Sequence, residues 1–410
     1  MPTSRDRVLQ AVNYRQPDRV PIDLGGHRSS GMMAIAYHKL KQHLGITGGD
    51  IYVYDFIQQL AIIEPVVLDR FGVDTVELGR GFSLDPADWH PWTLPDGTPC
   101  KIPAFIHPVK VNGDWHVYHE DGTLITIQKA GGLYFEQTCF PLQGDQSNSW
   151  DLDAAFSKVM WAALGSPPAP IGFDPDGLKQ LEAGAKRLRQ STDRVIIGLF
   201  GGNLLENSQF LFGMADFYMM LAAEPRRAHR LLDRLVEMHL ANLDKFLSAV
   251  GSYIDIILFG DDLGMQTGPQ ISPKMFAEYF QPRYKLMWGR AKALAEVKVM
   301  LHSCGGIYPL LPGLIDAGLD ILQPVQTTCT GMEAHRLKRE FGRDLCLWGG
   351  GCDTQHVLAS GTPAEVAADV RRRVEVFAPG GGFVFQQIHN IMADVPPENV
   401  VAMLEAVNEC

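Results

Sequence analysis

The sequence lacks the features that would direct it to a membrane or to nucleic acid. No apolar run reaches the 18 residues of a membrane-spanning helix, and no apolar stretch follows the first residues as a secretory signal would require. The net charge is −11, and no run of Lys or Arg is long enough to make a local basic exception, which argues against a nucleic-acid partner. These absences predict a cytoplasmic protein that contacts no membrane.

Cysteine is scarce and occurs in an odd number. The seven cysteines show no paired spacing, so a disulfide framework is not expected, and single thiolates become candidate metal ligands or nucleophiles. A Gly-rich dinucleotide fingerprint is also missing, because Gly25-Gly26-His27-Arg28 lacks its spacing. An open nucleotide-binding sheet is therefore disfavoured.

What the sequence does contain is a regular alternation of short β-rich runs with helical stretches. Apolar runs of this length flanked by Gly are typical of parallel strands that are buried on both faces. Eight such units predict a single (β/α)8 TIM barrel over 1–410, an α/β fold with right-handed connections. The runs cover 20–24, 74–78, 195–200, 254–259, 297–301, 320–323, 345–348 and 383–387.

One stretch, 81–150, does not follow this alternation. It is rich in Pro, Trp and turn pairs, and 115–127 alternates around Asp121-Gly122 as a β-hairpin does. We interpret 81–150 as a small β-rich insertion after the second strand, near the barrel mouth.

Polar residues collect just after the predicted strands, where the active sites of such barrels lie. We predict that Asp261, Asp262 and His389 are catalytic, with one of the two aspartates facing the pocket and the other capping a helix or pairing locally. The predicted binding residues for a small-molecule substrate are His27, Arg28, Arg80, Asn203 and Gln326. The two arginines would hold a carboxylate.

The sharpest local signal is His302-Ser-Cys304. Residues i and i+2 of a strand point to one face, so the imidazole and the thiol converge in a way that suits zinc. Two ligands do not hold a metal, and a third must come from another strand end. Cys352 and His389 are the candidates, and three protein ligands with one open position would make the site catalytic.

Three segments resemble the uroporphyrinogen-decarboxylase superfamily: the opening Arg5-Asp-Arg-Val-Leu, the element from Gly260-Asp-Asp to Ser272-Pro-Lys-Met-Phe, and the last third from Leu301-His-Ser-Cys to Pro396-Pro-Glu-Asn. The resemblance covers nearly the whole chain. True decarboxylases of this superfamily need no metal, and they carry Arg-Gln-Ala-Gly-Arg in the first loop. Here that loop reads Leu24-Gly-Gly-His-Arg28, so only Arg28 matches.

The His-x-Cys element resembles instead the zinc-dependent methyltransferase branch, whose third ligand is a Cys after the eighth strand. His302 and Cys304 match, but the third position offers His389. The resemblance implies zinc-dependent methyl transfer between a small methoxy, amine or thiol compound and a corrinoid (cobalamin) cofactor or corrinoid protein. The corrinoid-binding Asp-x-His-x-x-Gly pattern is absent, so the corrinoid would not be tightly bound.

Two other functions stay open at this point. A metal-independent decarboxylase would use Arg28, Asp261 and His389 on a small or tetrapyrrole carboxylic acid. A barrel that binds a corrinoid or tetrapyrrole without turnover is the third alternative, which the cluster of acids and ligands disfavours. The apolar helices permit a homodimer, but no residue pattern fixes an interface.

Overall fold

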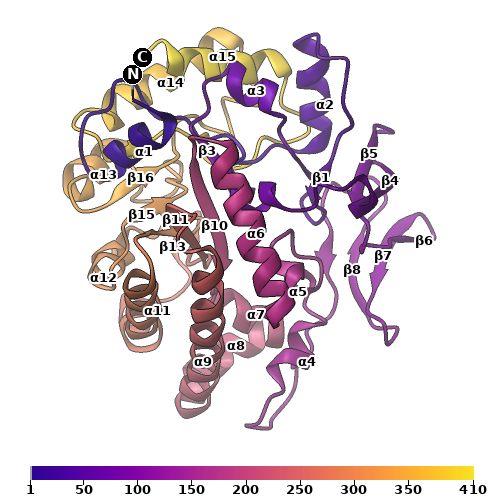
Figure 1. Ribbon diagram of the computed structural model, residues 1–410. Coiled ribbons are helices and arrows are strands. Elements are labelled where there is room, and N and C mark those ends of the chain that lie inside the picture. The colour runs from indigo at the N-terminus through magenta and orange to yellow at the C-terminus, as the bar shows by residue number, and fades with distance from the viewer. Residues whose placement is uncertain (1) are drawn as a thin grey trace.

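The barrel sheet is the central feature of the computed structural model, which describes residues 2–410 (Figure 1). Seven parallel strands are hydrogen-bonded in the order β17-β16-β15-β14-β11-β10-β3. Their bounds are β3 (Thr75–Glu77), β10 (Val195–Gly201), β11 (Ile256–Gly260), β14 (Lys298–His302), β15 (Ile321–Gln323), β16 (Cys346–Trp348) and β17 (Phe383–Val384). Each strand coincides with one of the predicted runs.

The remaining predicted run, 20–24, closes the sheet between its two edges. Ile22 forms a parallel bridge with Phe385, and Phe385 N donates to Pro21 O at 2.8 Å. On the other side Asp74 N donates to Ile22 O, also at 2.8 Å. The sheet is therefore a closed (β/α)8 TIM barrel, as the sequence predicted.

Apolar side chains fill the lower part of the barrel interior. They come from alternate positions of the strands, as the two-residue period requires, and include Ile197, Met300, Ile321 and Val384. Helix α1 (Ser4–Val12) packs against this cluster through its apolar face and closes the amino-terminal end. The carboxyl-terminal end is left for polar residues.

Helices surround the barrel in the order that βα repetition imposes. The long helix α9 (Pro225–Val250) packs between α6 (Pro175–Ser191) and α11 (Gln281–Leu294), and α14 (Pro363–Phe377) packs against α15 (Pro397–Asn408). Helix α14 begins with the capping box expected from Thr362 and Glu365. Shorter helices are α2 (Ala34–His43), α3 (Pro65–Arg70), α4 (Leu152–Phe156), α5 (Met160–Ala163), α7 (Leu205–Phe212), α8 (Met214–Ala223), α10 (Pro273–Met275), α12 (Leu311–Asp316) and α13 (Ala334–Phe341). No helix within residues 2–410 has the length and apolarity to cross a membrane.

Two small antiparallel sheets follow β3 in the chain and lie to one side of the barrel in Figure 1. One joins β4 (Trp89–Thr93) and β5 (Pro99–Pro103), and the other joins β6 (Val109–Val111), β7 (Asp114–Tyr118), β8 (Leu124–Gln128) and β9 (Glu136–Gln137). The pairing of β7 with β8 forms the expected hairpin around Asp121-Gly122.

A further hairpin, which the sequence did not predict, connects these sheets to the barrel. Strands β1 (Val53–Asp55) and β2 (Leu60–Ala61) enclose Phe56, whose ring centroid lies 4.3 Å from that of Phe135 and 5.3 Å from that of Trp92. This aromatic contact fixes residues 53–61 as a wall of the barrel mouth.

Candidate metal centre

Side chains of the uppermost inward-facing positions line the carboxyl-terminal end of the barrel. Because residues two apart share a face, His302 follows the interior residue Met300, and Gln323 follows Ile321. By the same alternation Glu77 follows Thr75, whose hydroxyl bonds to the buried Asp23 carboxylate. The strands thus change from apolar to polar at one level of the barrel.

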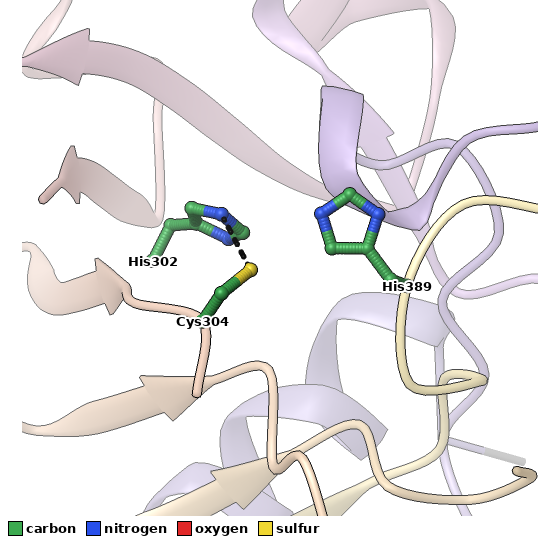
Figure 2. A group of neighbouring side chains, drawn as sticks. All are labelled: His302, Cys304 and His389. Carbon is green, nitrogen blue, oxygen red and sulfur yellow. Dashed lines mark hydrogen bonds between the residues drawn. The ribbon is translucent and has the colours of Figure 1, made fainter. Parts of the chain in front are cut away.

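Three of these side chains form a group of candidate metal ligands, called the donor cluster below. His302, Cys304 and His389 each offer one ligand atom, and these atoms all lie within 4.8 Å of one another. Figure 2 shows His302 and Cys304 on one side, with His389 facing them from the opposite loop. The Cys304 Sγ lies 3.5 Å from His302 Nε2, and the two imidazole centroids are 5.7 Å apart. The structure therefore brings together the ligand pair expected from the sequence and one of its two candidate partners.

The donor cluster fits zinc in its spacing. Ligand bonds of about 2.0 Å to nitrogen and 2.3 Å to sulfur, at tetrahedral angles, place the two ligand atoms about 3.5 Å apart. The observed Sγ–Nε2 distance of 3.5 Å equals that value. Two imidazole nitrogens and one thiolate sulfur are also donor types that zinc prefers in proteins.

A neighbouring glutamine sets which nitrogen of His302 is available. Gln323 Nε2 donates to Gln386 Oε1 at 3.1 Å, so its Oε1 is the acceptor that lies 2.6 Å from His302 Nδ1. The proton of the neutral ring is therefore assigned to Nδ1, and the Nε2 lone pair faces Cys304. Such an outer hydrogen bond is the usual device that orients a metal-binding imidazole.

Burial keeps the donor cluster in a form that suits a cation. It lowers the pKa of His389 to about 4, with a further contribution from His302, and it also lowers the pKa of His302. Both rings are thus neutral near pH 7, as ligands must be. Burial and the nearby Asp262 raise the pKa of the Cys304 thiol, an effect that a bound divalent cation reverses.

The paired aspartates after β11 lie in different surroundings. Asp261 is fully buried and accepts hydrogen bonds from the backbone N–H groups of Leu204, Leu205 and Glu206, each at 2.8 Å, and from Tyr284 Oη at 2.5 Å. It fixes the start of α7. Burial nevertheless raises the pKa of Asp261 to about 6, while these hydrogen bonds lower it. With both oxygens so engaged, Asp261 is a structural residue in this arrangement.

Asp262 is the aspartate that faces the donor cluster. Its Oδ1 lies 3.5 Å from His302 Nε2 and accepts a hydrogen bond from Cys304 N at 2.7 Å. About a third of its side chain is exposed, so it is accessible from the mouth. Glu206 lies nearby, held by Asn203 Nδ2 at 2.7 Å, and burial together with Asp262 raises its pKa. Glu206 was not identified from the sequence, because it sits inside a helix rather than after a strand.

Cys352, the other candidate for a third ligand, is not part of the donor cluster. Among residues 2–410 the group contains only the two histidines and Cys304. The Cys352 side chain is fully buried and belongs to the main apolar core, where burial raises the pKa of its thiol. Of the two candidates for the third ligand, the geometry therefore favours His389 over Cys352.

The predicted substrate residues surround the mouth in different ways. His27 is fully buried with Nε2 3.2 Å from Asp23 Oδ2, and Arg28 Nε lies 3.5 Å from Asp55 Oδ2. Arg80 donates to the carbonyl of Ile63. Asn203 holds Glu206, and Gln326 Oε1 accepts from Gly305 N at 2.8 Å. Asn203 and Gln326 therefore support the loops around the donor cluster. His27, Arg28 and Arg80 instead contact residues of the segment 23–63.

Comparisons with known proteins place the chain in one family. The sequence model described as Uroporphyrinogen decarboxylase (URO-D) matches residues 173–410. Among curated proteins, the uroporphyrinogen decarboxylase of Pseudomonas fluorescens is 29% identical over 295 residues, covering 70% of this chain and 76% of that protein. The corresponding protein of Methylococcus capsulatus is 27% identical over 193 residues, or 46% of this chain. That alignment spans about half of the relative, 51%.

A solved structure shares the fold over the full length. A methyltransferase from Methanosarcina mazei superposes with a TM-score of 0.58 at 17% sequence identity, covering 100% of this chain and 99% of the other. This similarity is evidence for the fold alone.

Proposed function

The chain belongs to the uroporphyrinogen decarboxylase family, and from this premise we propose that it is a zinc-dependent methyltransferase. It would move a methyl group between a small methylated compound, with a methoxy, amine or thiol group, and a corrinoid cofactor or corrinoid protein. The observation that carries the proposal is the donor cluster, in which Gln323 fixes the His302 tautomer that points Nε2 at Cys304. A decarboxylase that needs no metal has no use for this arrangement.

His302, Cys304 and His389 would hold the metal. Bound zinc would supply Lewis acidity, which lowers the pKa of a thiol or polarises a methoxy oxygen. Three protein ligands leave one tetrahedral position for the substrate. The corrinoid would approach through the mouth, either free or on a partner protein.

Asp262 is the residue that would handle the proton of the substrate. Its carboxylate is fixed by the Cys304 N–H, which leaves the side chain oriented beside His302 and accessible from the mouth. There it can accept a hydrogen bond from a substrate thiol or amine, or return a proton to a departing oxygen. Asp261 would contribute indirectly, because it holds the start of α7 and thereby Glu206.

A metal-independent decarboxylase is the second candidate function, because the curated relatives are uroporphyrinogen decarboxylases. Of its three expected residues, Arg28 and His389 lie at the mouth, whereas the Asp261 oxygens are already occupied by four donors. The geometry therefore supports this function less well.

The metal content of protein purified without added metal or chelator tests the proposal. We expect close to one zinc per chain, lost in a His302→Ala/Cys304→Ala variant and retained in Cys352→Ala, which is the matched control for removing a thiol. The zinc form would then be mixed with cob(I)alamin and methoxy, methylamine or methylthio donors, and methylcob(III)alamin would be followed by absorbance. Wild-type protein without metal after zinc loading, but active on a carboxylic acid, would overturn the proposal in favour of decarboxylation.

A further inference from the structure

Buried polar atoms without a partner concentrate on one side of the barrel mouth. In the described part of the chain, seventeen buried side-chain nitrogen or oxygen atoms lack a hydrogen-bond partner. Seven of these belong to five residues between positions 27 and 77: both ring nitrogens of His27, Nε of Arg28, the hydroxyl of Tyr54, both amide atoms of Gln59 and Oε1 of Glu77. His27 Nε2 lies 3.2 Å from Asp23 Oδ2, and Arg28 Nε lies 3.5 Å from Asp55 Oδ2, which leaves Tyr54, Gln59 and Glu77 as the residues of this group without any such neighbour. Native proteins leave few such atoms unpaired, so a local excess points to a ligand that pairs with them.

Two of these atoms share a small cavity. Tyr54 and Glu77 line a space of about 20 Å³ together with Arg80 and Gly25, which is room for one water-sized group. Burial raises the pKa of Glu77 to about 7 and raises that of Tyr54 well above its usual value. Burial outweighs the charges of Arg28, His27 and Arg80, which lower the pKa of Glu77, and Glu77 Oε1 has no hydrogen-bond partner.

Gln59, whose two amide atoms lack partners, also has an unusual backbone conformation. Gln59 has φ = 55°, in the left-handed region that a residue with a side chain seldom adopts, and it is only 1% exposed. The preceding Gln58 Oε1 accepts from Asn390 Nδ2 at 3.0 Å, so this turn lies against the residue next to His389. The turn that joins β1 to β2 thus holds the buried, unpaired amide of Gln59 close to the loop that carries His389.

Two arginines and two carboxylic residues lie around the cavity and the adjoining part of the barrel mouth. Arg28 lies between Asp55, at 3.5 Å, and the ring of Trp161, whose centroid is 5.7 Å from the guanidinium carbon. Arg80 and Glu77 supply a second cation and a second carboxyl. Arg28 Nε is 3.5 Å from Asp55 Oδ2 but has no hydrogen-bond partner, and neither has Glu77 Oε1. A ligand that carries an anionic acceptor for Arg28 and a cationic donor for Glu77, with no net charge, would pair with both.

We propose that Arg28, Tyr54, Gln59 and Glu77 form a subsite for a zwitterionic, amino-acid-like end of the substrate. Its carboxylate would face Arg28, and its ammonium group would face Glu77 and Tyr54. This inference rests on the proposed function, because it places the methylated end of the same molecule toward the donor cluster. The charges of Arg28 and His27 act on both Glu77 and His302, so these two residues are neighbours of the subsite and of the donor cluster alike.

Binding of three methoxy probes by calorimetry tests the subsite without requiring turnover. O-methyl-L-serine carries both charges, 2-methoxyethylamine carries only the cation, and methoxyacetate carries only the anion. We expect the zwitterion to bind at least about tenfold more tightly than either of the others. Glu77→Gln should reduce its affinity to that of methoxyacetate, and Arg28→Gln to that of 2-methoxyethylamine, whereas the exposed-site control Glu120→Gln should leave all three unchanged.

The same titrations on His302→Ala/Cys304→Ala separate this inference from the proposed function. Retention of the zwitterion preference there supports the subsite even if no methyl transfer is ever detected. Equal binding of the three probes by the wild type, or binding of none, would overturn the subsite. So would an unchanged preference in Glu77→Gln, provided that circular dichroism shows that the variant is folded.

Discussion

The two ends of strand β3 carry buried carboxyls in opposite conditions. Asp74, just before the strand, is fully buried and accepts hydrogen bonds from Arg7 at 2.7 Å, from two nitrogens of Arg19 at 2.8 and 2.9 Å, and from Ile22 N at 2.9 Å. Glu77, at the end of the strand, is 2% exposed, leaves Oε1 without a partner and has its pKa raised to about 7. The carboxyl before β3 is thus fully hydrogen-bonded, whereas the carboxyl at the end of β3 is buried with one oxygen unpaired.

The largest effect is expected at the amino-terminal end. Asp74→Asn removes the charge that the buried Arg7 and the partly buried Arg19 share, and breaking a buried pair in this way costs about 3–5 kcal/mol of unfolding free energy. Urea denaturation followed by circular dichroism measures it. Asp69→Asn, which loses only an exposed pair with Arg194, should cost less than about 1 kcal/mol. Equal losses in the two variants would contradict the contrast between the ends.

At the carboxyl-terminal end, removing a carboxyl charge should stabilise the protein rather than destabilise it, and the size of the effect should depend on pH. Because the pKa of Glu77 is about 7 in the folded chain against 4.5 for the free group, the folded state favours the protonated form. Its contribution to stability is fully present below about pH 4.5 and is lost as pH rises through 7, a change of at most about 3 kcal/mol. The unfolding free energy of Glu77→Gln minus that of the wild type should therefore be larger at pH 8 than at pH 5. A constant difference between the two proteins across this range would contradict the unpaired state of Glu77.

A smaller effect, on zinc affinity, is expected from Gln323, which orients the candidate metal ligand His302. Gln323→Leu removes the acceptor of His302 Nδ1 and should weaken zinc binding about 10–100-fold in a competition titration with a chelator. Gln323→Glu keeps an acceptor at the same place and should restore most of the affinity, while Gln355→Leu on the surface serves as control. Wild-type affinity in Gln323→Leu would show that the tautomer is set in another way.

The smallest effect is expected at the buried thiol outside the donor cluster. Cys352→Ala should lower the unfolding free energy by about 1 kcal/mol through the small cavity it leaves, and it should leave the zinc content unchanged. Loss of zinc in this variant would contradict the assignment of His389.

The barrel could be predicted from the sequence because its strands are short apolar runs, a signal that depends on local pattern alone. Even the run at 20–24, which forms only a single bridge, was recognisable by this pattern. The hairpin of β1 and β2 was not, because two strands of three and two residues leave almost no periodic signal. It is held instead by contacts of Phe56 with residues far along the chain.

The candidate site was predicted in part. His302 and Cys304 were recognised because their convergence follows from strand geometry two residues apart. The choice between Cys352 and His389 depends on how two loops come together in space, which spacing along the chain does not determine. Glu77 and Gln323 were not predicted, because both are the last inward-facing residues within their strands, whereas the other site residues follow the strands.

Zinc K-edge X-ray absorption of the protein as purified would identify the atoms bound to the metal. We predict one sulfur at about 2.3 Å and two imidazole nitrogens at about 2.0 Å, with the remaining position filled by a light atom. A sphere with two sulfurs would contradict the assignment of His389 as the third ligand. Protein that binds no zinc after loading would contradict the donor cluster as a metal site.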